Sequence, residues 1–507
     1  ATALVISVVE PYSAGIGGGG FLVLRLAADD AIESLDFREK APHQARRDMY
    51  LGEDGQVVPG RSVDGYLSVA VPGTVAGLAE VHKKHGRRPW RTLVQPAIRI
   101  AEEGFLLDEV FVQALERRQE PLLRYPAGRA LFAPKGQLRR AGERFRQPEL
   151  AKTLRRIAKD PTDFYTGATA RAVVADMERN GGLVTAADLA NYAPQWREPV
   201  CGDFRAHRVC SMPPPSSGGV HLIEILNLLE KTPLKTLGWN SVDGLHAMIE
   251  AMRIAYADRA EHLGDPAFWK VPVSELTSIE YARLRAKEIS LERVRASTEV
   301  VAATNAQLQA VRHESNDTTH LTVVDKERNA VALTFTVNYG FGSGVIVPGT
   351  GVLLNDEMDD FAAAPGVPNS YGLVGGEANA VQPGKIPLSS MTPFVVTREG
   401  RLVLAGGSPG GSTIITTSLQ LVLNVIEHQM DAAAAVAAPR IHHQWLPDTT
   451  LYEPFGLDVG TRRDLEARGH SLSPRDRWGN ASAIVLTEEG WLEGAADPRG
   501  VGTAAGF

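Results

Sequence analysis

The sequence predicts a globular fold that mixes α-helices and β-strands, on the evidence of its composition and of two periodic patterns. Its 507 residues are 44% hydrophobic and 22% charged, close to the average for folded soluble domains. Ser241 could cap a helix, because apolar residues follow it at spacings of three and four, at Leu245, Met248, Ile249, Met252 and Tyr256. Residues 318–324 and 330–338 are rich in β-formers, and the second run alternates bulky with small side chains, which predicts a hairpin.

The length of the chain allows about three domains or one large one. Residues 299–316 are polar and lack a clear period, so we expect an exposed connector ahead of the hairpin. Glycine and proline are frequent at 365–376 and 406–411, and a helix-like run at 419–426 follows the second of these stretches.

Charge and hydropathy exclude two classes of protein. The formal net charge of −7 argues against nucleic acid as a main partner, which usually needs a basic face. No apolar run approaches the roughly 18–20 residues of a membrane span, and the run at residues 1–9 ends at Glu10-Pro11. We therefore expect no membrane span, and no signal peptide can be read at the start of the chain.

The two cysteines flank a predicted hairpin. If Arg205-Ala206 is its two-residue loop, counting outward places Cys201 directly opposite Cys210. A disulfide and two ordinary strand cysteines both remain open, and a disulfide would need an oxidising compartment. Two cysteines cannot build a zinc site unaided.

Gly15, Gly17 and Gly20 fit the pattern G-x-G-x-x-G, which in dinucleotide-binding proteins follows a strand and opens a helix. Here the order is reversed, because the residues after the glycines look like a strand. We therefore interpret the pattern as a tight turn with close backbone packing.

Gly406, Ser408 and Gly410 fit G-x-S-x-G, in which the residue after a nucleophilic serine donates its N–H to an oxyanion. That residue is Pro409, which has no N–H, so Ser408 is a poor nucleophile. The amides of Gly410 and Gly411 could still form an oxyanion hole for a nucleophile from elsewhere in the chain. A plain glycine turn is the alternative.

Thr318 is the candidate nucleophile, because it lies where the polar connector meets a strand. A threonine hydroxyl needs an adjoining base, and its own α-amine can serve once the chain is cut before it. Thr-Thr pairs at strand starts are usually structural, and a structural pair is the alternative. His442 and His443 are neighbours that point to different faces, so we expect packing rather than a shared metal.

Several longer stretches resemble the γ-glutamyltransferases. They are residues 15–20, 36–39, 71–74, 213–219, 318–320, 355–361, 387–391 and 408–412. The resemblance covers nearly the whole chain. It implies an α+β fold of the N-terminal-nucleophile hydrolases, a four-layer αββα sandwich, in which a self-cleaved precursor gives a large subunit (1–317) and a small subunit (318–507) that form one fold as a heterodimer. The family normally has a further segment before Ala1.

The resemblance also implies the site residues. Thr318 would cut the chain after Asp317 and then attack the γ-carbonyl of the substrate, with Thr336 supporting it and Gly410 and Gly411 forming the oxyanion hole. The substrate's α-carboxylate would bind Arg38, Ser389 and Ser390, and its α-ammonium would bind Asn338, Glu357 and Asp360. Residues 365–376 align with a lid loop whose aromatic residue is Tyr371, which favours a small γ-glutamyl donor.

The function implied is that of a γ-glutamyltransferase or glutathione hydrolase without metal or cofactor. Its donors would be glutathione and other γ-glutamyl compounds, its acceptors water, an amino acid or a dipeptide, and its location the periplasm or the exterior of the cell. The alternatives are a glutaryl-cephalosporin-type acylase on the same fold and a catalytically silent binding protein. Asp360 favours γ-glutamyl donors, because a glutaryl group has no ammonium to bind it.

Overall fold

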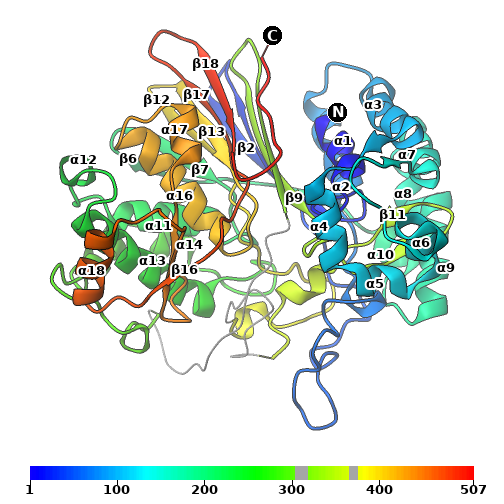
Figure 1. Ribbon diagram of the computed structural model, residues 1–507, viewed down its shortest axis with the longest axis horizontal. Coiled ribbons are helices and arrows are strands. Elements are labelled where there is room, and N and C mark those ends of the chain that lie inside the picture. The colour runs from blue at the N-terminus through cyan, green and yellow to red at the C-terminus, as the bar shows by residue number, and fades with distance from the viewer. Residues whose placement is uncertain (303–317, 365–374, 507) are drawn as a thin grey trace.

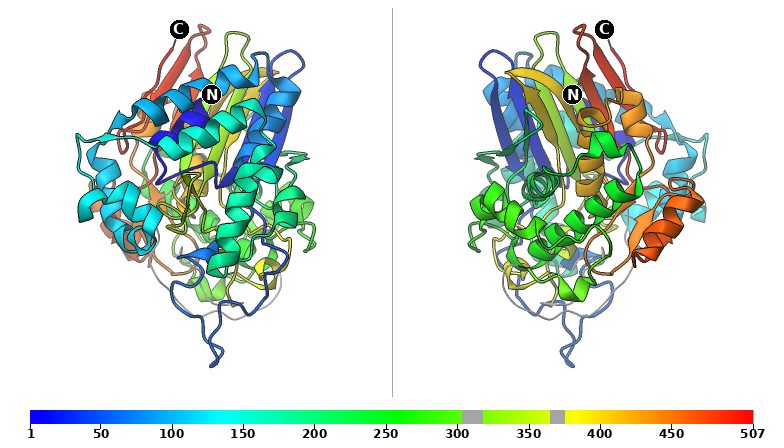
Figure 2. Two further views of the ribbon diagram at one scale, coloured as in Figure 1. Left: turned by 90° about the vertical axis from the view of Figure 1, so that its right-hand side faces the viewer. Right: turned by 90° about the vertical axis from the view of Figure 1, so that its left-hand side faces the viewer.

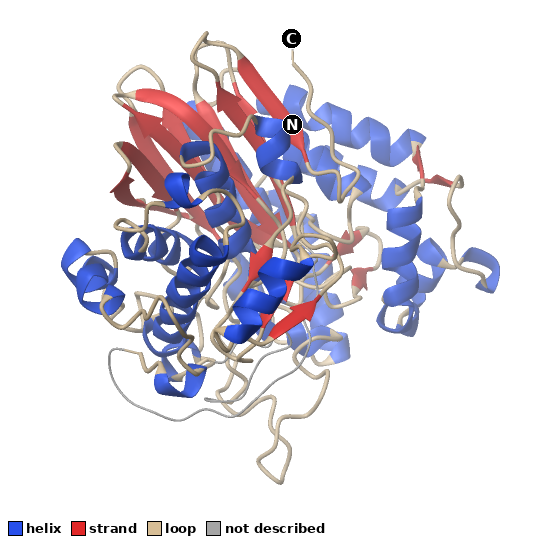
Figure 3. Cartoon of the chain, turned by 60° about the vertical axis from the view of Figure 1, so that its left-hand side comes forward, coloured by secondary structure: helices blue, strands red, loops and turns tan. Residues whose placement is uncertain are grey.

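Two antiparallel sheets stacked face to face form the middle of the molecule in a computed structural model that describes residues 1–302, 318–364 and 375–506. Figure 3 shows the strands gathered together with helices on either side. The first sheet has the order β5-β2-β1-β9-β8, from Gln195–Arg197, Ala31–Phe37, Gly19–Leu26, Ala330–Thr336 and Thr319–Val324. The second has the order β18-β17-β13-β12-β7-β6, from Leu492–Ala496, Ser482–Leu486, Arg401–Gly407, Phe394–Arg398, His207–Ser211 and Val200–Phe204.

A helical layer covers the outer face of each sheet (Figure 1). On the first sheet the helices are α1 (Thr2–Val9) and α2 (Thr74–His85), with α3 (Trp90–Glu103) and α7 (Pro148–Lys159) behind them. On the second they are α11 (Gly218–Leu228), α16 (Thr413–Ile426) and α17 (Ala432–Ala437), with α13 (Val242–His262) behind. Figure 2 shows each layer in turn in front of the strands. The expected four-layer αββα sandwich is confirmed.

Shorter elements complete the two helical sides. On the side of the first sheet they are α4 (Glu109–Arg117), α5 (Gln119–Arg124), α6 (Pro126–Phe132), α8 (Asp163–Thr166), α9 (Ala168–Asn180) and α10 (Ala186–Ala190). On the other side they are α12 (Leu234–Leu237), α14 (Val273–Leu276), α15 (Ile279–Ala286) and α18 (Val459–Ala467). Small sheets pair β3 (Phe105–Leu106) with β4 (Arg144–Phe145), β10 (Ile346–Val347) with β11 (Val352–Leu353), and β14 (Ile441–His442) with β15 (Thr450–Tyr452) and β16 (Leu472–Pro474).

The alternation of side chains along the strands builds two separate apolar layers. On β1, Leu22 and Leu24 face the first helical layer with Phe335 of β9, whereas Phe21 and Val23 face the second sheet. Because β1 pairs with β9 in the first sheet and β7 pairs with β12 in the second, strands from before and after residue 318 share both sheets. The two parts of the chain therefore form a single fold.

The two helices and the hairpin that the sequence predicts are confirmed, and only the start of one helix differs. Ser241 accepts a hydrogen bond from the Gly244 N–H and caps α13. The predicted hairpin is β8 and β9. The helix expected at 419–426 is α16, which begins six residues earlier, at Thr413. Its first turns contain threonine and serine, whose low helix propensity hid this start in the sequence.

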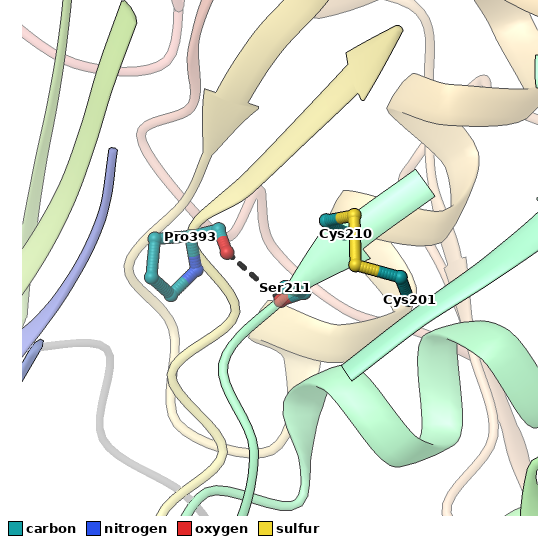
Figure 4. Close-up of a disulfide and its surroundings, with 4 residues drawn as sticks. All are labelled: Cys201, Cys210, Ser211 and Pro393. Atoms are coloured by element: carbon teal, nitrogen blue, oxygen red, sulfur yellow. Dashed lines mark hydrogen bonds between the residues drawn. A yellow bond between two sulfur atoms is a disulfide. The ribbon is translucent and has the colours of Figure 1, made fainter. Parts of the chain in front are cut away.

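The hairpin that contains the two cysteines has the turn and the strand pairing that the sequence predicts. Arg205 and Ala206 both have positive φ and make the two-residue turn between β6 and β7. Cys201 pairs with Cys210 across the ladder, and a disulfide joins them. Figure 4 shows this bridge beside Ser211, whose hydroxyl donates to the Pro393 carbonyl at 2.8 Å.

The glycines at the start of β1 pack closely against other backbone segments, as the sequence analysis predicts. A Cβ built on Gly17 would lie 2.0 Å from the Leu353 carbonyl oxygen, and one on Gly20 would lie 2.5 Å from the Thr334 carbonyl oxygen. Both positions therefore need glycine because another backbone segment packs directly against them. No helix among the described residues is long and apolar enough to span a bilayer.

Candidate active site

Thr318 lies directly before β8, at one end of the space between the two sheets. Thr319 pairs with Phe335 and His320 with Thr334, so the same register places Thr318 opposite Thr336 at the end of β9. The two hydroxyl oxygens are 3.2 Å apart. Thr336 Oγ1 also accepts the backbone N–H of Asn338 at 2.8 Å, which fixes the hydroxyl that supports Thr318.

One cavity brings together most of the residues that the sequence predicts for the site. Its lining includes Thr318, Thr336, Arg38, Asn338, Glu357, Asp360, Ser389, Ser390 and Gly411. Arg38 lies 280 positions before Thr318 in the sequence, and the fold brings both to the same cavity, as binding of a common substrate requires. Asp317 and Tyr371 lie outside the described residues.

Arg38 is the centre of a buried cluster of charges at this cavity. It follows β2, and its side chain is 1% exposed. Its Nη1 pairs with Glu357 Oε1 and its Nη2 with Asp360 Oδ2, both carboxylates belonging to the 3-10 turn Glu357–Asp360. Glu39 Oε2 lies 4.0 Å from Nη1. One guanidinium therefore meets three carboxyl groups.

Burial and these neighbours move the pKa values of the whole cluster. Burial alone would lower the pKa of Arg38, but Glu357, Asp360 and Glu39 outweigh it and hold that pKa above its ordinary value. Burial raises the pKa of Glu357 and of Asp360, although Arg38 opposes the shift at both. Burial likewise raises the pKa of Glu39 to about 7, against the opposing effect of Arg38. The cluster therefore holds a proton near neutral pH.

The loop predicted to form the oxyanion hole connects β13 to α16. Gly411 lines the cavity immediately before the N-terminus of this 14-residue helix, where backbone N–H groups and the helix dipole favour negative charge. Gly410 precedes it with φ of 133°, a conformation that suits glycine, but it is not among the lining residues. Ser408 is fully buried and donates its hydroxyl to the Pro409 carbonyl at 2.8 Å, which agrees with its exclusion as nucleophile.

Two serines and an arginine also line the cavity. Ser389 Oγ accepts the Met391 N–H at 3.1 Å, and Ser390 Oγ accepts a hydrogen bond from Arg259 Nη2 at 3.2 Å. Arg259 also donates to Ser217 Oγ at 3.1 Å. A second guanidinium thus contributes positive charge beside the serines.

Arg259 and Glu39 are site residues that the sequence analysis missed. Arg259 continues the three- and four-residue spacing of Met252 and Tyr256 on α13, so a cation on this buried stripe was a readable signal. Glu39 directly follows Arg38 within a stretch that carried the resemblance. It is fully buried, yet neither of its carboxylate oxygens has a hydrogen-bond partner among the described residues.

The histidines near these residues serve structural contacts. His320 Nδ1 lies 2.8 Å from Thr334 Oγ1 and its Nε2 lies 3.0 Å from Thr322 Oγ1. Burial lowers the pKa of His320 to about 3, so its imidazole is neutral at working pH. His442 bonds to Thr416 and Gln444, which fits the expected packing role. Within the described ranges no cluster of three His, Cys, Asp or Glu side chains could hold a metal ion.

Comparison with known proteins agrees with this geometry. The model of the gamma-glutamyltranspeptidase family matches residues 1–507. The glutathione hydrolase proenzyme of Escherichia coli (strain K12) is 43% identical over 503 residues, which are 99% of this chain and 86% of that protein. The acylase ACY 1 proenzyme of Pseudomonas sp. (strain V22) is 37% identical over 512 residues, which are 99% of this chain and 88% of that protein.

A solved structure shows the same architecture. The crystal structure of a cephalosporin acylase from Bacillus halodurans superposes with a TM-score of 0.86 at 29% identity, covering 100% of this chain and 90% of that one. The family match extends over the whole chain, and the identity to the glutathione hydrolase is higher than to either acylase. This chain belongs to the γ-glutamyltranspeptidase family.

Proposed function

We propose that this protein is a self-processing γ-glutamyltransferase and glutathione hydrolase whose nucleophile is Thr318. The observation that carries the proposal is that Thr318 shares one cavity with a buried arginine, the carboxyl groups of Glu357 and Asp360, and two serines. A nucleophile next to groups that recognise both charges of an amino acid fits a substrate whose reacting carbonyl is joined to a free α-amino acid end.

The acyl-transfer step follows from the position of Thr318. Its Oγ1 attacks the γ-carbonyl carbon, its hydroxyl proton passes to its own free α-amine, and the carbonyl oxygen becomes an oxyanion near the N-terminus of α16. Collapse of this intermediate transfers the proton to the departing amine and leaves a γ-glutamyl ester on Thr318. Water or a second amine then attacks the ester, which restores the hydroxyl.

Donor recognition uses the cluster around Arg38. The α-carboxylate of the donor would bind Arg38 with the Ser389 and Ser390 hydroxyls. The α-ammonium would bind Glu357, Asp360 and the Asn338 side-chain oxygen, since Asn338 Nδ2 donates to the Asp356 carbonyl at 3.1 Å. A zwitterion adds no net charge to this buried cluster, which favours it over a substrate of one charge.

Maturation would use the same hydroxyl. Attack on the Asp317 carbonyl and hydrolysis of the resulting ester would give a large subunit of residues 1–317 and a small subunit beginning at Thr318. Supporting this, both curated relatives described above are named proenzymes. The two subunits would stay together as a heterodimer, because β1 pairs with β9 over seven residues and β7 with β12 over four.

A periplasmic or secreted location is part of the proposal. The support is the Cys201–Cys210 disulfide, because such bonds persist mainly in oxidising compartments.

A glutaryl-type acylase is the second candidate function, because the acylase structure superposes over the whole chain. The donors of the two functions differ in whether they carry an ammonium group that can bind Asp360. A γ-glutamyl donor brings an ammonium to it, whereas a glutaryl donor brings no cation that this mostly buried carboxylate could bind. The composition of the cavity favours the γ-glutamyl donor.

The test compares two anilides that differ only in the α-ammonium. We expect the purified protein to run as two bands on a denaturing gel, and to release the amine from γ-glutamyl-p-nitroanilide faster than from glutaryl-p-nitroanilide. Glycylglycine should accelerate release if an amine can replace water. A preference for the glutaryl donor would establish the acylase, and a single band without release would indicate a silent binding protein.

A further inference from the structure

The loop between β13 and α16, residues 408–412, contributes to two cavities that meet at Thr318. Ser412 lines the narrow cavity that contains Arg38, whereas Pro409 lines a second cavity of ≈810 Å³, against ≈30 Å³ for the first. The walls of the second cavity also include Arg117 and Arg477. Because the loop borders both spaces beside the nucleophile, the groups that fix its position bear directly on the reaction.

Local hydrogen bonds join the two glycines of the loop to the first turn of α16. The Thr413 N–H and Oγ1 donate to the Gly410 carbonyl at 3.1 Å and 2.6 Å. The Ile414 N–H donates to the Gly411 carbonyl at 3.2 Å. The glycines and the start of the helix therefore form one unit, and a group that holds Ser412, the residue between them, also holds the glycines.

Two side chains from outside this unit hold Ser412. Ser412 is the N-cap residue of α16 and is fully buried. Its carbonyl oxygen accepts a hydrogen bond from Tyr256 Oη of α13 at 2.5 Å, and its hydroxyl donates to Gln444 Oε1 at 2.7 Å. The helices α11, α13 and α16 lie together on one side of the second sheet (Figure 1). The two contacts thus anchor the loop to this helical layer.

The ring of Tyr256 is itself held between two histidines. His221 of α11 stacks on it, with ring centroids 5.9 Å apart and an angle of 8° between the planes. His442 packs against it almost perpendicularly, with centroids 5.7 Å apart and an angle of 88°. Tyr256 is only 2% exposed. This packing restricts the ring, so its hydroxyl stays at the Ser412 carbonyl.

His442 connects the two supports of Ser412. Its Nε2 lies 2.8 Å from Gln444 Oε1, and its Nδ1 lies 2.9 Å from Thr416 Oγ1. An amide oxygen can only accept, so the hydrogen bond to Gln444 assigns the proton to Nε2 and leaves Nδ1 to accept from Thr416. Burial lowers the pKa of His442 to about 3, so the ring stays neutral and keeps these contacts at working pH.

We propose that Tyr256 is a positioning residue for the reaction, whose hydroxyl acts through the Ser412 carbonyl to hold the amides of Gly410 and Gly411 where the oxyanion forms. His442 and Gln444 support the same arrangement. The proposal rests on the proposed function, because the oxyanion is that of acyl transfer. Such amides act mainly on the transition state, so a loop that has lost a support should lower the rate and leave donor binding unchanged.

The experiment measures kcat and KM for γ-glutamyl-p-nitroanilide in Tyr256→Phe, which removes the hydroxyl at Ser412 and keeps the ring. We expect kcat to fall about ten- to a hundredfold, as displacement of catalytic groups does. Formation and hydrolysis of the ester both pass through an oxyanion, so both steps should slow and KM should not change. Glutaryl-p-nitroanilide should lose the same factor, because its oxyanion is the same.

A second readout compares a tetrahedral inhibitor with a ligand that stays planar. A boronic acid in place of the side-chain carboxyl of glutamate can form a tetrahedral adduct with Thr318 Oγ1, whereas glutamate itself cannot. The inhibition constant of the boronic acid should rise in Tyr256→Phe by about the factor lost from kcat/KM. The inhibition constant of glutamate should not change.

Ser412→Ala removes the other support, the hydrogen bond to Gln444. It should lower kcat for both anilides by the same factor, which tests the loop independently of Tyr256. Two bands on a denaturing gel show that each variant matures, and all constants are expressed per cleaved protein. Slower maturation is then not counted as slower turnover.

Tyr165→Phe is the matched control. Tyr165 Oη donates to the Pro72 carbonyl at 3.2 Å and accepts the Ala76 N–H at 3.0 Å, and Tyr165 lines neither cavity. The control loses two buried hydrogen bonds, so it should lower the melting temperature at least as much as Tyr256→Phe. It should alter neither kcat, nor KM, nor the two inhibition constants.

An unchanged kcat in Tyr256→Phe, a higher KM without a lower kcat, or an equal loss in the control would overturn the proposal. A changed pH profile of kcat would also overturn it, because the Tyr256 hydroxyl would then transfer a proton instead of holding the loop. Failure of the proposed function would look different, since the wild-type protein would release no nitroaniline under any condition.

Discussion

The two cavities that meet at Thr318 are built in opposite ways. The one at Arg38 is narrow and lined by buried charges that already contact one another, so only a ligand that satisfies all of them can enter. The second cavity is wide. The arginines on its walls, Arg117 and Arg477, are exposed and make few contacts with the rest of the protein. The difference teaches that paired charges in a narrow cavity and exposed charges in a wide one should respond differently to the loss of a partner.

The cost of burying charge explains the strictness. Desolvated ions are stabilised only by well-placed partners, so a donor that lacks the ammonium or the carboxylate leaves a buried group unpaired. Exposed charges are screened by water and gain little from any single contact. Substitutions in the two cavities should therefore differ both in size and in which kinetic constant they change.

Asp360→Asn should have the largest effect on donor choice. Removing the charged partner of a bound ammonium costs on the order of 1.5–3 kcal/mol, so kcat/KM for a γ-glutamyl anilide should fall about ten- to a hundredfold. A glutaryl anilide has no ammonium and should lose far less, and the KM for glycylglycine should not change. Equal losses for the two donors would refute the role given to Asp360.

Glu39→Gln should change how stability depends on pH. The pKa of Glu39 is raised to about 7 in the folded protein from about 4.5 when exposed, so the folded state keeps a proton that the unfolded state has lost. The contribution of the Glu39 carboxyl to the free energy of unfolding is therefore fully present below about pH 4.5. It is lost as the pH rises to about 7. The variant, which cannot titrate, should gain stability relative to wild type across this window.

Melting temperatures of the two proteins between pH 4.5 and 8 check this expectation. Losing the contact with Arg38 shifts the variant by a constant amount, so only the change of the difference with pH is informative. A difference that stays constant across the window would mean that Glu39 does not hold its proton near neutral pH.

His320→Ala should have the smallest effect on the chemistry, because His320 belongs to neither cavity. Its ring is held by Thr334 and Thr322, and its pKa of about 3 keeps it neutral, so it cannot supply an ionisation near neutral pH. We expect the pH profile of kcat/KM in the cleaved variant to keep its single ionisation, which belongs to the α-amine of Thr318. Disappearance of the basic limb in correctly formed subunits would make the histidine the base.

The residues that line the cavity at Arg38 could be picked out from the sequence because they occur in short, distinctive stretches. Asn338, Glu357 and Ser389 each lie within a few positions of other site residues, and the fold only has to bring those stretches together. The sequence did not decide whether the disulfide forms, for a different reason. It depends on a two-residue turn, and the positive φ angles of Arg205 and Ala206 that fix its register cannot be deduced from their side chains.

The second cavity could not be predicted from the sequence. Its walls come from residues near 10, 117, 409 and 477, none of which forms a pattern with the others. Arg117 and Arg477 look like ordinary surface arginines until the fold places them around the same space as Thr318. The same applies to Arg259, whose role depends on the fold bringing Ser390 Oγ within 3.2 Å of its Nη2.

The most direct test of the account is the Thr318→Ala protein, because one hydroxyl is assigned both to cleavage of the chain and to turnover. Denaturing gel electrophoresis of the purified variant, with amine release from γ-glutamyl-p-nitroanilide measured on the same sample, reports both reactions. The account predicts a single band of full length and no amine release. Two bands of the sizes expected for residues 1–317 and 318–507, or amine release at the wild-type rate, would contradict it.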